Sequence, residues 1–198
     1  TTADFTIDAD GTNSARFQPE INSSSSSGSY IDFEFKFYKT GTSTLVSLEN
    51  FFITAVDIDG GSTSQEFAEL QDFASYAVGT GSGLVITQNF RDTFTRFRGI
   101  TSSLNGITFE NTASLVTNFS NPVSAINIRL GNTGSSSTAR LFSVAMGPSI
   151  GTFSGSSSSN DSRTVTGTAT ISNTEAGTIS GTLTTTVGDT TALSITGN

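Results

Sequence analysis

The chain has 198 residues, with 17 acidic and nine basic side chains, no histidine, no cysteine and a net charge of −8. The absence of cysteine excludes disulfide frameworks, thiolate metal sites and thiol nucleophiles, and without histidine the usual catalytic triads are also excluded. The acidic balance argues against nucleic-acid binding, which needs a basic surface. No apolar run approaches the roughly 20 residues of a membrane-spanning helix, so no membrane insertion is expected.

The acidity is concentrated in the first part of the chain. Residues 1–80 carry 12 acidic and three basic side chains, whereas residues 81–198 carry five acidic and six basic ones. A local excess of carboxylates needs a counter-charge. A bound cation would supply it, and screening by solvent ions is the simpler alternative.

The clearest predicted strand spans residues 30–38, where aromatic or aliphatic side chains alternate with charged ones. A period of two places the apolar side chains on one face of a strand and the charges on the other. Such a strand covers a core on one side and meets water on the other, as in antiparallel sheets. The stretch 39–42 that follows predicts a turn.

The rest of the chain predicts many short strands separated by Gly, Asn and Ser, about ten residues apart. This spacing is typical of an all-β, antiparallel β-sandwich, jelly-roll-like in its organisation. Residues 64–77 are ambiguous, because three apolar side chains at three-residue steps also fit a short helix. Further strands are predicted at residues 51–58, 67–73, 76–78, 84–87, 94–98, 107–109, 115–119, 123–130, 140–146, 164–171, 178–186 and 192–195.

The aromatic residues divide the chain. All 16 phenylalanines lie at or before Phe153, and a Ser/Gly-rich stretch follows at residues 154–160. We therefore predict a ligand-binding β-sandwich over residues 1–153, and a Ser/Thr-rich β extension or joint to the next module over residues 154–198. The chain begins at Thr1 without a methionine, which suggests a piece of a larger multidomain protein. Its cysteine-free, Thr- and Ser-rich composition favours an extracellular, bacterial cell-surface location, with a cytosolic β-domain as the alternative.

Two Asp-x-Asp-Gly motifs are the strongest chemical signal in the sequence. The first contains Asp8 and Asp10, and the second contains Asp57 and Asp59 at the end of an apolar predicted strand. Residues two apart on a strand share a face, at about 6.8 Å along the backbone. Two carboxylates held so close repel each other, and a divalent cation between them would reverse the sign of that interaction.

The ligand types around the second motif favour calcium. Asp57 and Asp59 are followed by Gln65 and Glu66, so the set contains only oxygen donors, which suit calcium better than zinc or copper. Neither motif has the glutamate that an EF-hand needs at its twelfth position. The predicted metal ligands are Asp8, Asp10, Asp57, Asp59, Gln65 and Glu66; the alternative for each motif, and especially for the first, is a solvated turn.

Catalysis is not predicted. Glycoside hydrolysis needs only two carboxylates about 5–9.5 Å apart, and Asp32 with Glu34 meets this spacing, but any strand with alternating charges does so. Arginines at 91, 96 and 98 form a basic cluster. They suit capture of an acidic group, or pairing with the acidic half of the same domain.

Several segments together resemble the peptide-binding domain of RTX-type bacterial adhesins. They are the alternating strand Tyr30–Tyr38, the turn Lys39-Thr40-Gly41-Thr42, the run Phe52-Ile53-Thr54-Ala55-Val56-Asp57-Ile58-Asp59-Gly60 with Glu66, and the late strand Arg140-Leu141-Phe142-Ser143. The resemblance covers most of residues 1–150. It implies a calcium-dependent β-sandwich of a large adhesin, in which Asp57, Asp59 and Glu66 hold calcium and the ion meets the C-terminal carboxylate of a captured protein.

The sequence thus predicts a non-enzymatic, calcium-dependent ligand-binding module of a secreted bacterial adhesin, which mediates attachment to cells or surfaces, including biofilm. Its expected partners are extracellular peptides or protein C-termini. Two alternatives remain open at this point: a calcium-dependent carbohydrate-binding module that takes glycans, and a structural spacer that calcium only stiffens. The residues that contact the ligand itself are not identified by the sequence.

Overall fold

The computed structural model of the chain describes residues 3–7, 16–23, 29–100, 106–134, 139–147, 157–159, 179–184 and 190–195. It separates into two units, Thr1–Ser162 and Arg163–Asn198. The composition suggested a division after Phe153, and the roles assigned to the two parts remain predictions. Within the described ranges, no helix is long and apolar enough to cross a membrane.

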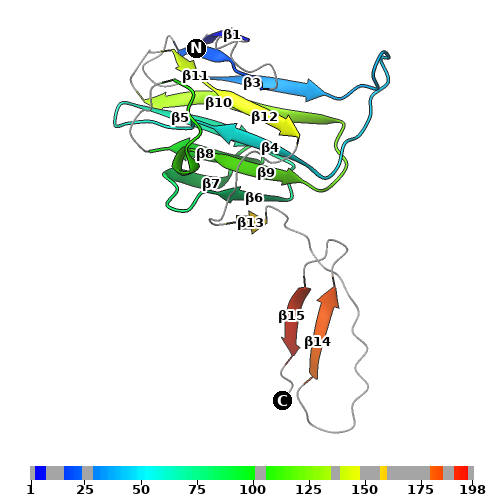
Figure 1. Cartoon of the computed structure of the whole chain (residues 1–198). Coiled ribbons are helices and arrows are strands. Elements are labelled where there is room, and N and C mark those ends of the chain that lie inside the picture. The colour runs from blue at the N-terminus through cyan, green and yellow to red at the C-terminus, as the bar shows by residue number, and fades with distance from the viewer. Residues whose placement is uncertain are drawn as a thin grey trace. The chain divides into compact units, whose positions relative to one another are not determined.

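The larger unit contains a five-stranded antiparallel sheet in the order β3-β10-β5-β8-β7 (Figure 1). Side chains along β3 alternate between half-buried and exposed, as the period of two predicts, with Ile31, Phe33 and Phe35 packed against the core. The strands span Ser29–Lys36 (β3), Ala125–Gly134 (β10), Ser64–Leu70 (β5), Phe94–Gly99 (β8) and Leu84–Arg91 (β7).

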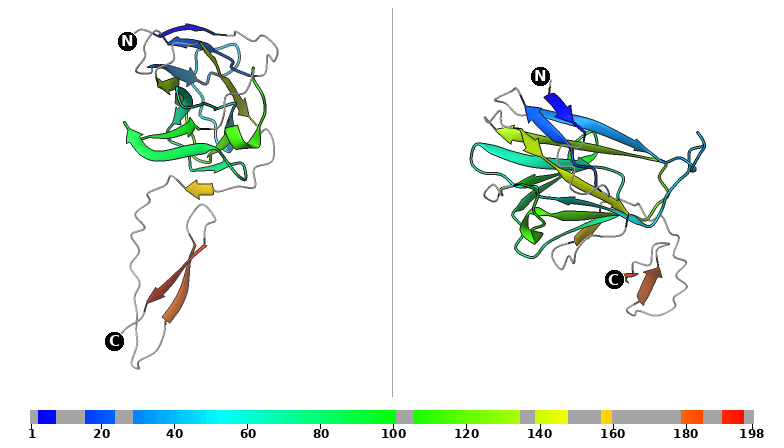
Figure 2. Two further views of the ribbon diagram at one scale, coloured as in Figure 1. Left: turned by 90° about the vertical axis from the view of Figure 1, so that its left-hand side faces the viewer. Right: turned by 45° about the horizontal axis from the view of Figure 1, so that its top comes forward.

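A second five-stranded antiparallel sheet, in the order β12-β4-β9-β6-β13, packs on the first (Figure 2). From β3 to β6, successive strands alternate between the two sheets, and β9 and β10 return to pair between earlier strands, as in a jelly roll. The predicted all-β, antiparallel sandwich is therefore confirmed. The strands span Ser143–Gly147 (β12), Phe51–Val56 (β4), Leu115–Phe119 (β9), Ser75–Val78 (β6) and Ser157–Ser159 (β13).

Three short strands form a further antiparallel sheet at the rim of the larger unit: β1 (Ala3–Thr6), β2 (Glu20–Ser23) and β11 (Arg140–Leu141). One turn of 3-10 helix, η1, spans Asn111–Ala113. The smaller unit contains the described antiparallel pair β14 (Ile179–Thr184) and β15 (Thr190–Ile195).

The core lies between the two five-stranded sheets. Its largest fully buried members include Phe97, Phe119, Phe142 and Ile53. The rings of Phe51 and Phe119 stack with centroids 5.0 Å apart. Aromatic side chains bury large areas, so this cluster allows the domain to form a stable core without disulfides.

One ambiguity is resolved and two local predictions need correction. Residues 64–77 contain no helix, as the strands predicted at 67–73 and 76–78 implied: β5 and β6 are joined by a turn in which Asp72 has φ 62°. The segment 107–109 is not a strand, and β7 continues to Arg91, beyond the predicted end at residue 87. Pairing with β10 on one side and β8 on the other holds β5 in an extended conformation. This pairing overrides the local three-residue spacing of apolar side chains that also fits a helix. The predicted strand at 164–171 lies outside the described residues.

Candidate functional site

Three acidic side chains are buried together where β4 leads into β5. Asp57 is 5% exposed, Asp59 2% and Glu66 4%. Asp57 and Asp59 lie in the turn that follows β4, and Glu66 lies near the start of β5, at the same end of the sandwich (Figure 1). Acidic side chains are almost never buried so fully unless they are paired or bind a metal ion.

The backbone of this turn is held close to its neighbours. The strand ends at Val56 because Asp57 adopts φ 62°, a conformation that aspartate and asparagine tolerate better than most residues. The Ile58 N–H donates to the Ala113 carbonyl (2.7 Å). A Cβ built on Gly99 would lie 2.3 Å from the Ile58 carbonyl oxygen, so only glycine permits this approach of β8 to the turn.

Further hydrogen bonds join Asp59, in the turn after β4, to Glu66, near the start of β5. The Glu66 N–H donates to the Asp59 carbonyl (2.8 Å), and the Asp59 N–H lies 3.5 Å from Glu66 Oε2. A Cβ on Gly60 would lie 2.5 Å from the Gln65 Cα. The tight turn therefore places the Asp59 and Glu66 side chains beside each other.

The electrostatic environment opposes ionisation of these groups. Burial raises the pKa of Asp57 to about 7, with a further rise from the nearby charge of Asp59, while a backbone hydrogen bond from Thr108 acts in the opposite direction. Burial also raises the pKa of Glu66 well above its usual value, and Asp59 adds to this shift. Arg140 lowers the pKa of Glu66 through an ion pair, but its Nη1 lies 3.7 Å from Glu66 Oε1, which is too far for a hydrogen bond.

Two oxygen atoms at this site have no hydrogen-bond partner among the described residues: Oδ1 of Asp57 and Oδ1 of Asn132. Asn132 is 4% exposed, and on β10 it lies directly opposite Glu66 of β5. Its Nδ2 donates to Ser64 Oγ (3.3 Å). Buried oxygens without partners are costly, and each needs an explanation such as a water molecule or an ion.

The sequence did not single out Asn132 as a site residue. It lies in a Gly/Asn/Thr/Ser-rich segment that is typical of a loop, and nothing local distinguishes it. Only the antiparallel register of β10 and β5 places its amide beside Glu66.

The other predicted ligands are not joined to this group by the described structure. Gln65 and Glu66 are successive residues of β5, so their side chains point to opposite faces of the sheet. The Gln65 Oε1 accepts a hydrogen bond from the Arg98 guanidinium and lies 3.4 Å from the Thr133 hydroxyl. Asp8 and Asp10 lie outside the described residues.

The donor chemistry of the buried group fits a hard cation. It offers the carboxylates of Asp57, Asp59 and Glu66 and the amide oxygen of Asn132, and such oxygens are typical calcium ligands. Within the described part of the chain, no three acidic, histidine or cysteine side chains are arranged to hold an ion by themselves. Calcium takes six to eight oxygens, including backbone carbonyls and water, so a site here would need such additional donors.

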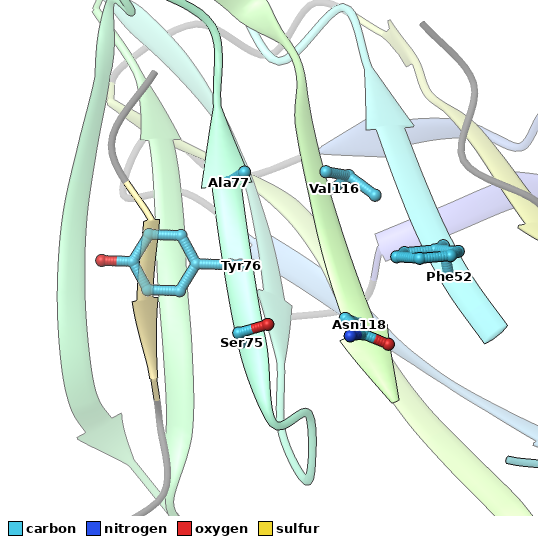
Figure 3. A pocket seen from close by; sticks show the side chains of 6 residues that line it. All are labelled: Phe52, Ser75, Tyr76, Ala77, Val116 and Asn118. Carbon is cyan, nitrogen blue, oxygen red and sulfur yellow. The ribbon is translucent and has the colours of Figure 1, made fainter. Parts of the chain in front are cut away.

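A shallow hollow of about 130 Å³ lies on the outer face of the second sheet (Figure 3). Figure 3 shows the Phe52 and Val116 side chains next to each other on neighbouring strands. Among the described residues, no acidic or basic side chain lines the hollow, so this lining offers no charge to an ion or a carboxylate. Its lining consists of Phe52, Ser75, Tyr76, Ala77, Val116 and Asn118.

Comparison with known proteins gives no relative: no family model, no curated protein and no solved structure matches the chain.

Proposed function

We propose that this chain is a calcium-dependent ligand-binding module of a bacterial surface adhesin, with no enzymatic activity of its own, and that its ligand is the C-terminus of an extracellular peptide or protein. The observation that carries the proposal is the buried group of Asp57, Asp59 and Glu66. Three carboxylates lie 2–5% exposed, and the Arg140 guanidinium lies 3.7 Å from one of them, Glu66.

A divalent cation would resolve the electrostatic conflict in this group. Burial and mutual repulsion raise the pKa of Asp57 and of Glu66, which means that the charged forms are poorly stabilised without a counter-charge. The unpartnered oxygens of Asp57 and Asn132 are donors that an ion would satisfy. These features support a calcium site more strongly than the sequence motif alone.

The position of the site supports the proposed ligand capture. The turn that carries Asp57 and Asp59, here called the acidic turn, lies at an end of the sandwich (Figure 2). Residues on connecting segments at such an end contact partners more often than residues within the sheets do. A bound calcium that keeps a replaceable water presents a strong local positive charge on an acidic protein. A terminal carboxylate is a suitable replacement for that water.

The proposal is tested with a library of hexapeptides carrying free C-termini and the same library with amidated C-termini. Binding is measured in calcium and after calcium removal. We expect binding only for free C-termini and only in calcium. Equal binding in all four conditions would refute the proposal.

Variants connect this binding to the acidic group. Asp57→Asn and Glu66→Gln keep the size of the side chains and remove one charge each, and Asn tolerates the positive φ of position 57. Both variants should lose calcium uptake in titration calorimetry together with peptide binding. Glu49→Gln changes an exposed acid elsewhere and serves as the control.

A purely structural calcium site is the second candidate function, and the depth of burial favours it. Side chains that are 2–5% exposed leave little access for a visiting molecule. In this case calcium would raise the stability of the domain by mass action, whereas none of the hexapeptides would bind. Calcium uptake without peptide binding therefore distinguishes the structural site from the adhesive one.

A further inference from the structure

Arginine and aromatic side chains alternate in a continuous stack on the outer face of the β3-β10-β5-β8-β7 sheet. Each arginine in the stack lies over two rings, with its guanidinium carbon 3.8–5.4 Å from the ring centroids. The order of the stack is Phe67, Arg96, Phe90, Arg91, Tyr30, Arg129 and Phe94.

The stack requires β7 to bend over the sheet. β7 and β3 are the two edges of this sheet, so their backbones are about 19 Å apart if the sheet is flat. Arg91 at the end of β7 nevertheless reaches the Tyr30 ring (5.4 Å) and the Tyr30 hydroxyl (3.5 Å). The register shift between Thr87 and Arg91 provides the bend. Figure 1 shows β7 on the opposite side of this sheet from β3.

The inner part of the stack is neutralised within the domain. Glu69, which is fully buried, accepts hydrogen bonds from Arg96 and from Arg129 (2.9 Å). Asp32 accepts a second hydrogen bond from Arg129 (2.6 Å). These pairs agree with the alternative interpretation of the basic cluster, in which it pairs with acids of the same domain.

The outer part of the stack is different. Arg91 is exposed and forms no ion pair with any described residue, including its neighbour Asp92. The two rings that flank it, Tyr30 and Phe90, are 38% and 39% exposed. A charge held between two exposed rings is thus presented to solvent on a protein whose net charge is −8.

We propose that Tyr30, Phe90 and Arg91 form a second binding site, independent of calcium, for a polysaccharide that carries carboxylate groups. Arginine holds a carboxylate with two parallel hydrogen bonds, and the aromatic stack fixes its guanidinium in place beforehand. Arginines cover the faces of both rings in the stack, so the exposed edges of Tyr30 and Phe90 are the apolar surfaces that can contact the C–H groups of a sugar. The Tyr30 hydroxyl and the exposed Asn89 amide provide partners for sugar hydroxyls.

An acidic peptide would satisfy the charge of Arg91, but it would not use the exposed edges of the two flanking rings. Two exposed rings on either side of one cation suit a ligand that combines an anionic group with a rigid ring, as each unit of an acidic polysaccharide does. The site lies on the outer face of the first sheet and shares no residue with the acidic turn. Its ligand is therefore additional to the peptide proposed above.

The test measures binding of a tetragalacturonate and of its methyl ester to the full chain, in the absence of calcium. We expect the acid to bind and the ester to bind far more weakly. Arg91→Gln should weaken binding of the acid roughly 10- to 100-fold, since charge-assisted hydrogen bonds are lost. Tyr30→Ala should also weaken it, because it removes an exposed ring edge and one of the two rings that hold the Arg91 guanidinium in place. Lys39→Gln removes an exposed cation from a different turn and is the matched control.

Three results would overturn the proposal. Equal weakening by Arg91→Gln and Lys39→Gln would show attraction by charge alone. Equal binding of acid and ester would exclude a role for the carboxylate. Tighter binding of a tetraglutamate peptide than of tetragalacturonate would assign the surface to acidic peptides. Asp57→Asn should leave this binding unchanged, so failure here is distinguishable from failure of the calcium proposal.

Discussion

Replacing Asp57 by Asn should make the stability of the metal-free protein less sensitive to pH. Asp57 is buried, and its pKa rises from 3.8 to about 7 in the folded state. The folded protein therefore holds this proton more tightly than the unfolded chain does. The resulting stabilisation is fully present below about pH 4 and is lost as the pH rises through 7.

The magnitude follows from the size of the shift. One pKa unit corresponds to about 1.36 kcal/mol, so a shift from 3.8 to about 7 is worth about 4 kcal/mol over the whole range. Between pH 5 and pH 8 the expected loss from this group is about 2.5 kcal/mol. The raised pKa of Glu66 acts in the same direction. Burial and Asp59 cause more of that shift than Asp57 does, so most of it remains in the variant and the comparison reports mainly on Asp57.

Urea denaturation followed by circular dichroism gives the free energy of unfolding at pH 5 and at pH 8 for the wild type and for Asp57→Asn, both stripped of metal. The asparagine variant preserves the positive φ of position 57, which alanine would strain by roughly 1–2 kcal/mol. The wild type should lose about 2.5 kcal/mol more than the variant between the two pH values. Parallel curves, within about 0.5 kcal/mol of each other, would refute this account of the site.

Three further predictions address the metal and the packing around it. At pH 8, calcium at about 100 times its dissociation constant should stabilise the wild type by about 2.7 kcal/mol in the same urea assay; an equal gain in Asp57→Asn would contradict the ligand assignment. Gly99→Ala should lower both the stability and the calcium affinity, because the added Cβ collides with the acidic turn, whereas Gly61→Ala, with open space around it, should change neither; calorimetry on both variants decides. Glu69→Ala should cost about 3–5 kcal/mol in thermal or urea unfolding, since it leaves two buried arginines without their shared partner, and a cost no larger than that of Glu49→Ala would show that the pair contributes little.

The sheet architecture was predictable because the signals that define it are local. Alternation along Tyr30–Tyr38 fixes which side chains of β3 face the core, and the spacing of Gly, Asn and Ser marks the ends of most strands. Local signals were ambiguous where pairing decides the outcome. The segment 64–77 fits a helical step, yet β5 lies between β10 and β8 and is extended.

The acidic group was likewise predictable only in part from local sequence. The motif Asp57-Ile58-Asp59-Gly60 and the nearby Glu66 were identified as one group from their spacing, and the structure does bury them together. The rest depended on partners distant in the chain. Gly99 packs closely against the turn, and burial by such neighbours raises the pKa of Asp57 and of Glu66.

The register between strands explains which contacts of the site residues the sequence did not predict. Chain order alone places Gln65 beside Glu66, but the pleat of β5 sends their side chains to opposite faces, and the pairing of β10 with β5 brings Asn132 to Glu66 instead. The bend of β7 likewise brings Arg91 to Tyr30, 61 residues away. The composition and alternation of the chain are sufficient to specify strands and their buried faces. Which side chains meet across those strands depends on pairing and curvature, and these are properties of the folded sheet as a whole.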